Sequence, residues 1–164
     1  ASGAVDPAWP ADGRTLCTGP STQVHPQIVT DGAGGAIVTF FDDSSGEPSL
    51  YAQHVFNGGA VDPAWPANGQ ALCTAGGPQY PVTIAIDGAG GAIVAWSDNR
   101  SGAKDIYAQR VLANGTVDPD WPPDGRALCT AAKTPRSSRK RTSRLAGCTL
   151  TSTVPGAILR CRTA

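Results

Sequence analysis

The sequence predicts an all-β protein built from two complete copies of one repeat. The motif Val-Asp-Pro-x-Trp-Pro begins at Val5, Val61 and Val117, which sets a period of 56 residues. Twenty glycines, fourteen prolines and few aromatic residues, without a sustained 3.6-residue apolar period, favour short strands joined by tight turns. A unit repeated this faithfully is expected to be a supersecondary module that buries its apolar faces against its neighbours.

The first two strands of a copy form a predicted hairpin. In the second copy they cover residues 82–86 and 92–97, and the Asp-Gly-Ala-Gly-Gly stretch at 87–91 supplies glycines that permit the positive φ of a tight turn. Residues 92–97 are almost continuously apolar rather than alternating. Such a strand is expected to be buried on both faces, between neighbouring sheets.

The third and fourth strands complete the copy. A polar turn at 98–102 precedes a half-buried strand at 105–112, and a connection at 113–124 with three prolines and a tryptophan leads to an outer strand at 126–130. The corresponding strands of the first copy are expected at 28–30, 36–41, 50–56 and 70–74. Residues 1–18 match only the last strand of a preceding unit.

Four-stranded antiparallel modules of this length are typical of β-propeller blades, which pack face to face around an axis. The alternative is a β-solenoid, whose repeats are usually shorter. The sequence therefore predicts a partial β-propeller. Its expected divisions are the outer strand of an incomplete blade at 1–18, blade 1 at 19–74, blade 2 at 75–132 and a basic tail at 133–164.

The stretch from Trp96 to Tyr107, WSDNRSGAKDIY, together with IAIDG at 84–88, resembles the blade signature of bacterial secreted or cell-surface repeat proteins with sialidase-like propellers. The resemblance covers roughly residues 23–130 and implies a fold. Sialidases also carry an Asp-box, three arginines and a Tyr/Glu pair; residues 112–121 do not form that box, and Glu47 is the only glutamate. No catalytic residue is carried over, and the chain is expected not to be an enzyme.

The three repeated tryptophans, Trp9, Trp65 and Trp121, lie in proline-flanked loops. An exposed ring there would stack on a sugar or on a partner's proline. The alternative is that each ring closes over its own loop and covers the outer strand. Trp96 and its counterpart Phe40 lie in the most apolar strand and are expected in the core.

A polar turn carries Asp98, Asn99 and Arg100, and Asp105 opens the next strand. The first interpretation is a charge-assisted clamp between Asp98 and Arg100 that holds the turn. The second is a weak calcium loop formed by Asp98, Asn99 and Asp105. The first copy has Asp42 and Asp43 but replaces Asp105 with a serine, so the oxygen ligands that calcium requires are not repeated.

Cysteines and histidines do not form a metal-binding pattern. Cys17, Cys73 and Cys129 recur once per repeat, too far apart in sequence for a zinc motif, and are expected to be small unpaired core residues. His25 and His54 have no equivalents in the other copy, and no Ser/His/Asp or Cys/His grouping recurs with them. No metal and no cofactor is predicted.

The tail at 133–164 breaks the pattern. It carries eight of the 13 Lys and Arg residues, none of the 13 acidic residues and no aromatic residue. One hypothesis is that a GC-rich gene is read out of frame beyond residue 132. The other is a basic arm, 136–144, that binds nucleic acid or an anionic surface, although it has no aromatic side chain to stack on bases. Under either hypothesis the tail is expected to be disordered.

The sequence thus predicts a non-catalytic repeat fragment that acts as a binding or structural scaffold in a secreted or cell-surface bacterial protein. The alternatives are a carbohydrate-binding module and the remnant of a sialidase-like enzyme. Expected partners are a glycan, a protein, or further copies that complete a ring; nucleic acid is not expected. No apolar run is long enough to span a membrane. The resemblance implies an extracellular or cell-envelope location, although no signal peptide is recognisable in this sequence.

Overall fold

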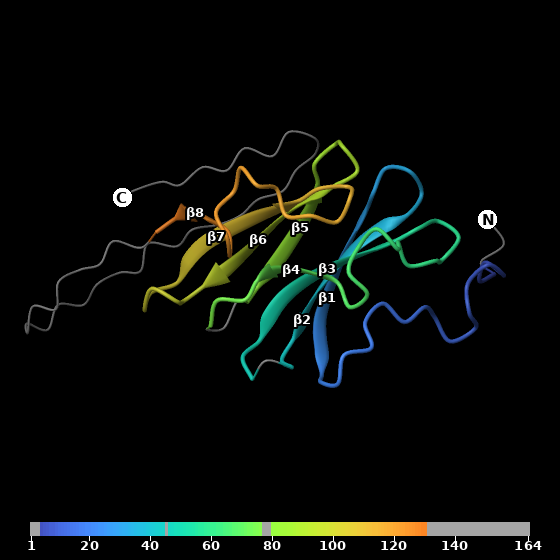
Figure 1. Cartoon of the computed structure of the whole chain (residues 1–164), viewed down its shortest axis with the longest axis horizontal. Coiled ribbons are helices and arrows are strands. Elements are labelled where there is room, and N and C mark those ends of the chain that lie inside the picture. The colour runs from blue at the N-terminus through green and yellow to red at the C-terminus, as the bar shows by residue number, and fades with distance from the viewer. Residues whose placement is uncertain (1–3, 45, 77–79, 131–164) are drawn as a thin grey trace, which may run out of the picture. The chain divides into compact units, whose positions relative to one another are not determined.

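The computed structural model describes residues 4–44, 46–76 and 80–130. These residues contain no helix and form two four-stranded antiparallel sheets, each with its strands in sequence order (Figure 1). The first sheet consists of β1 (Gln23–Thr30), β2 (Ala36–Asp42), β3 (Ser49–Val55) and β4 (Gln70–Cys73). The second consists of β5 (Val82–Ile86), β6 (Ala92–Asp98), β7 (Asp105–Val111) and β8 (Arg126–Cys129).

The eight predicted strands are confirmed. Eight of the sixteen strand ends match the expectation and seven differ by one residue, and β5 has both bounds that the sequence predicts. The main difference is β1, which begins at Gln23 instead of Ile28. A register shift between Val24 and Gln27 lets this extra stretch pair with the end of β2, and His25 takes a positive φ of 55° within the shift.

The outer strand expected in residues 1–18 is not formed. The structure assigns no strand to residues 4–22. The equivalent strands β4 and β8 exist because they pair with β3 and β7. The N-terminal stretch has no neighbouring strand among the described residues with which to form a ladder, so it consists of turns and irregular backbone.

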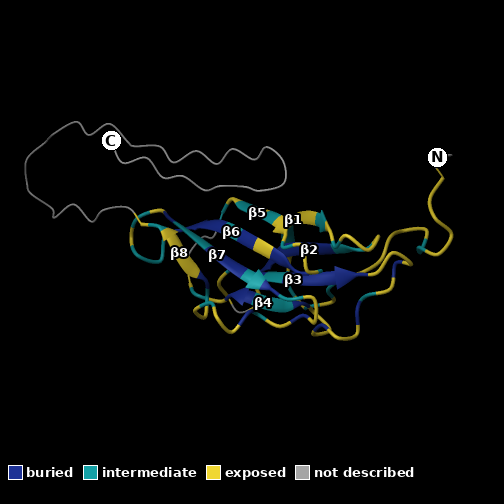
Figure 2. Ribbon diagram, turned by 90° about the horizontal axis from the view of Figure 1, so that it is seen from above, coloured by how far each residue is buried: buried dark blue, intermediate teal, exposed yellow. Residues whose placement is uncertain are grey.

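The core lies between the two sheets. Ile37 and Phe41 of β2 belong to the same buried cluster as Val94 and Trp96 of β6, and each is at most 1% exposed. Figure 2 shows that the central strands are buried whereas β8 is largely exposed. The prediction that Trp96 and Phe40 are core residues is confirmed, with exposures of 1% and 5%.

The prediction that 92–97 is buried on both faces is wrong for one face. Ile93 is 39% exposed, whereas its counterpart Ile37 is fully buried. Because side chains alternate along a strand, Ile93 points away from the face that carries Val94 and Trp96. The first sheet covers that inner face, but no other described sheet covers the outer one.

The two sheets do not close into a ring. Among the described residues no helix has the length and apolar character needed to cross a membrane. The predicted disorder of the basic tail concerns 133–164, which lies outside the described residues.

Candidate functional site

In each repeat one basic side chain bridges two aspartates. In the first repeat, His54 Nδ1 lies 2.8 Å from an Asp62 carboxylate oxygen and His54 Nε2 lies 3.0 Å from one of Asp31. In the second repeat, Arg110 bonds Asp87 through Nε and Nη2 at 2.9 and 2.7 Å. Its Nη1 reaches Asp118 at 3.3 Å.

The first aspartate of each bridge also holds the Asp-Gly-Ala-Gly-Gly hairpin. One Asp31 oxygen accepts hydrogen bonds from the amides of Ala33 and Gly35 at 2.7 and 2.9 Å. A Cβ at Gly35 would lie 2.5 Å from the Val55 carbonyl oxygen, so only glycine allows this approach. The glycine-rich motif therefore serves to seat the Asp31 carboxylate beside β3.

The environment of these carboxylates favours their charged form. Burial alone would raise the pKa of Asp31, but hydrogen bonds from Ala33, His54 and Gly35 outweigh it and lower the pKa below its ordinary value. The pKa of Asp87 is lowered in the same way, with Arg110 in place of the histidine. The hydrogen bond to Asp87 in turn raises the pKa of Arg110.

The second aspartate of each bridge shapes the Val-Asp-Pro-x-Trp-Pro loop. An Asp62 side-chain oxygen accepts from the Ala64 amide at 2.9 Å, and its carbonyl accepts from the Trp65 amide at 3.2 Å. Asp6 and Asp118 make the same two bonds in their loops. These two hydrogen bonds define a turn in which proline follows the aspartate. The turn fixes the backbone at the tryptophan and so orients its side chain.

Two of the three tryptophans join one repeat to the next. Trp65 is 3% exposed, its indole nitrogen donates to the Ala113 carbonyl at 3.2 Å, and its ring lies against Gly115. Trp9 makes the same hydrogen bond to Asn57 at 3.2 Å and lies against Gly59. The rings thus close over the loop of the following repeat and not over their own loop, and the buried Trp65 ring presents no face to a ligand.

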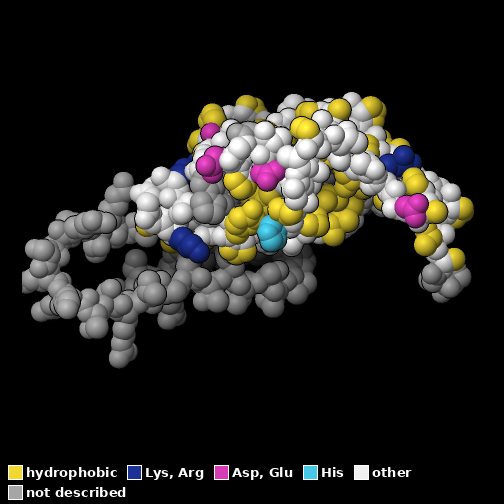
Figure 3. All heavy atoms as spheres, turned by 90° about the horizontal axis from the view of Figure 1, so that it is seen from below, with side chains coloured by type: hydrophobic (Ala, Val, Ile, Leu, Met, Phe, Trp, Pro, Cys, Tyr) yellow, Lys and Arg dark blue, Asp and Glu magenta, His cyan; other side chains and the backbone are white. Residues whose placement is uncertain are grey.

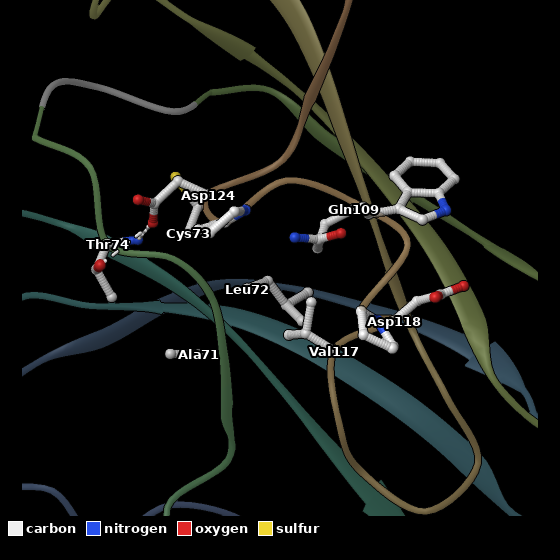
Figure 4. Close-up of a pocket in the computed structure, with 11 residues that line it drawn as sticks. Ala71, Leu72, Cys73, Thr74, Gln109, Val117, Asp118 and Asp124 are labelled. Carbon is white, nitrogen blue, oxygen red and sulfur yellow. Dashed lines mark hydrogen bonds between the residues drawn. The ribbon is translucent and has the colours of Figure 1, made fainter.

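Trp121 differs from the other two. It is half-buried, the Arg126 guanidinium lies 5.7 Å from its ring centre, and its indole nitrogen donates to none of the described residues. It borders a groove of about 450 Å³ between the two repeats (Figure 4). The groove is lined by Ala71, Leu72, Cys73, Thr74, Gln109, Val117, Asp118, Pro119, Trp121, Pro123 and Asp124.

Apart from the Trp121 indole, the polar side chains of this groove already have partners. Figure 4 shows Thr74 hydrogen-bonded to Asp124, whose carboxylate accepts from the Thr74 amide at 2.8 Å. Asp118 belongs to the Arg110 bridge, and the Gln109 amide donates to the Pro122 carbonyl at 2.9 Å. A molecule in the groove would therefore meet mainly apolar surface.

The clamp expected between Asp98 and Arg100 has the geometry that the first interpretation requires. Asp98 accepts hydrogen bonds from the Arg100 amide at 2.8 Å and from its Nε at 2.8 Å, and also pairs with Nη2. Arg100 also donates to the Cys73 sulfur at 3.1 Å and lies over the Tyr107 ring at 4.2 Å. The clamp thus binds the turn to the neighbouring repeat as well as to itself.

The residues of the calcium interpretation already have partners within the protein, although Asp98 and Asp105 lie opposite each other on β6 and β7. Asp98 faces Arg100 and the Trp96 indole, while Asp105 accepts from the Ser101 hydroxyl at 2.6 Å. The carbonyl of Asn99 accepts from the Gly102 amide at 2.8 Å within the turn. In the described ranges no group of three or more His, Cys, Asp or Glu side chains is arranged to hold a metal ion.

The repeated cysteines are free thiols. Cys73 is buried, whereas Cys17 and Cys129 are partly exposed, so the expectation of core positions holds fully only for Cys73. Burial raises the pKa of the Cys73 thiol to about 11, and the thiol is therefore protonated at neutral pH.

Sequence reasoning missed the bridges. His54 was expected to have no counterpart, yet it stands 56 residues before Arg110, at the same place on β3 as Arg110 on β7. It also missed Gln53 and Gln109, which are fully buried and tie the strands to the proline loops. Aligning the copies residue by residue would have shown both features, because the aspartates of the two bridges keep the period.

Comparison of the chain with protein-family models, with curated proteins and with solved structures found no match.

Proposed function

We propose that this chain is a non-catalytic module of β-propeller type that serves as a structural or binding scaffold in a secreted or cell-surface bacterial protein. The observation that carries the proposal is the use made of the repeated residues. The Asp-Gly-Ala-Gly-Gly aspartate, the loop aspartate and the loop tryptophan are all engaged in holding one repeat together or joining it to the next.

The charges of the repeat support the same proposal. Asp31 and Asp62 share His54, and Asp87 and Asp118 share Arg110, so the recurring carboxylates are all engaged within the fold. Reactive carboxylates in hydrolases are instead poised toward a cavity that takes the substrate. The resemblance to sialidase-like blades and the four-stranded meander of each repeat favour the propeller architecture.

Carbohydrate binding is the second candidate, and one observation favours it. Trp121 is half-buried beside a groove of about 450 Å³, and an indole face stacks well on the apolar face of a sugar ring. The scaffold has the stronger support, because the equivalent ring of Trp65 is buried against the next repeat.

The two candidates are separated by a binding experiment on the full chain. Tryptophan fluorescence would be followed while neutral and sialylated oligosaccharides are added to millimolar concentration, with Trp121→Ala as the variant. The scaffold predicts no saturable change in either protein. A saturable change that Trp121→Ala abolishes would replace the scaffold with a carbohydrate-binding function. Release of a chromophore from aryl glycosides by the wild-type chain would contradict the non-catalytic assignment.

A further inference from the structure

The junction between the two repeats shows which surfaces this fold pairs. Ile37 and Leu72 of the first repeat are 0% and 2% exposed, in the same apolar cluster as Val94 and Trp96 of the second. Ile84 of β5 packs against that cluster as well. One face of the first sheet is therefore complementary to the opposite face of the second.

The equivalents of three of these residues are exposed on the two outer faces. Ile93 and Leu128 of the second repeat, equivalent to Ile37 and Leu72, are 39% and 38% exposed. Ile28 of the first repeat, equivalent to Ile84, is 68% exposed. We call the surface with Ile93, Leu128 and Trp121 the trailing face, and the surface with Ile28 the leading face. Figure 3 shows hydrophobic side chains gathered in one continuous area on a side of the described part.

The trailing face also carries the polar groups of a junction. At the internal junction Trp65 donates to Ala113, and Thr74 donates to Asp124 through its amide and its hydroxyl. Trp121 is equivalent to Trp65, and its indole nitrogen donates to none of the described residues. The trailing face thus combines exposed apolar side chains with an indole donor that has no described acceptor. Their equivalents in the first repeat form the internal junction.

Residues 5–18 lie on the leading face, and their contacts show what the equivalent residues 117–130 of the trailing face would bind there. Residues 5–18 place Trp9 against Gly59, Arg14 on the Gly59 carbonyl at 2.7 Å and Thr18 on Asn68 at 3.1 Å. Residues 117–130 differ from them at only three positions, where Asp120, Pro123 and Ala127 replace Ala8, Ala11 and Thr15. Both stretches have arginine where the internal repeat has Gln70.

We propose that the trailing face of one copy of this chain docks on the leading face of a second copy, with residues 117–130 of the first replacing residues 5–18 of the second. Trp121 would then lie against Gly59 of the second copy, and Arg126 would take the bond that Arg14 makes. This deepens the proposed scaffold and rests on it. Because the two surfaces differ, the contact is head-to-tail, and it forms a ring or a chain of copies according to its rotation.

The test uses two complementary variants of the full chain under reducing conditions, studied by analytical ultracentrifugation. Ile93→Asp places a charge on the trailing face and Ile28→Asp on the leading face. Each variant alone is expected to remain monomeric, because every contact needs one intact face of each kind. An equimolar mixture is expected to form a one-to-one dimer, since each variant keeps the face that the other lacks.

Wild type is expected to associate as its concentration rises, and Ile93→Val to behave like wild type. Trp9→Ala, which loosens residues 5–18, should increase association, whereas Trp121→Ala should decrease it. A wild-type chain that stays monomeric up to about millimolar concentration, near the limit of weak association, would overturn the proposal. So would self-association of either Asp variant, or a mixture that contains no dimer.

Circular dichroism and a denaturation midpoint for each variant show whether it folds. If Ile93→Asp does not fold, Leu128→Asp replaces it on the same face. The proposed function is tested separately: saturable sugar binding at Trp121 would contradict the scaffold. A negative mixing experiment without sugar binding would instead leave the scaffold standing and remove only the second copy as its partner.

Discussion

His54 and Arg110 occupy equivalent positions on neighbouring repeats, and each joins the aspartate of a glycine-rich hairpin to the aspartate of the following tryptophan loop. The two bridges differ in burial, because the His54 side chain is 9% exposed and that of Arg110 is 32% exposed. Both His54 ring nitrogens face carboxylates, as the guanidinium nitrogens of Arg110 do. Two different side chains thus make the same bridge.

Replacing His54 with alanine should destabilise the fold at pH 7. The change removes the hydrogen-bond partner that Asp31 and Asp62 share, and we expect a loss of about 3 kcal/mol in the free energy of unfolding. His54→Arg, which copies the second repeat, should cost clearly less. Urea denaturation measures both, and equal losses for the two variants would show that the bridge is unimportant.

Removing the hydroxyl of Thr39 should stabilise the protein. Thr39 is fully buried in β2, and its hydroxyl oxygen has no hydrogen-bond partner among the described residues. Valine has nearly the same shape, so Thr39→Val should raise the free energy of unfolding by about 1 kcal/mol. A lower denaturation midpoint than that of wild type would indicate a partner for this hydroxyl.

Gly115→Ala should weaken the junction between repeats more than its φ alone explains. A Cβ there would lie 2.7 Å from the Trp65 ring, and the φ of 81° already disfavours alanine. Gly102 is the matched control, since its φ is 86° and no atom lies within 4 Å of a Cβ. We expect about 1 kcal/mol for Gly102→Ala and at least about 2 for Gly115→Ala. Equal costs in thermal denaturation would mean that the ring contact contributes nothing.

Part of the stability should be lost in acid through Asp42. Burial acts to raise its pKa, but hydrogen bonds from Ser44, Gln23 and Ser21 lower it from 3.8 to about 2. A lowered folded-state pKa gives stability that is present above pH 3.8 and is lost as the pH falls toward 2. Asp42→Asn should therefore show a smaller decrease between pH 4 and pH 2 in urea denaturation. An identical decrease would place the acid sensitivity elsewhere.

Sequence by itself determined the strands and their order. The period, the alternation of apolar and turn residues and the glycine-rich hairpins act locally. The sequence therefore predicted β5 to the residue and the other strand ends to within one residue, except for the start of β1. The Asp98–Arg100 clamp could also be predicted from the sequence, because its two residues are only two positions apart.

Contacts between distant segments were decided only by the tertiary structure. Trp65 donates a hydrogen bond to a carbonyl 48 residues away in the sequence. His54 is hydrogen-bonded to two aspartates that lie in separate loops. Residues 14–18 carry a strand pattern but form no strand, since a strand needs a neighbour to satisfy its backbone groups. A local pattern can specify a strand or a turn. Whether a side chain is buried, hydrogen-bonded to a distant residue or exposed to solvent depends on which surface packs against it.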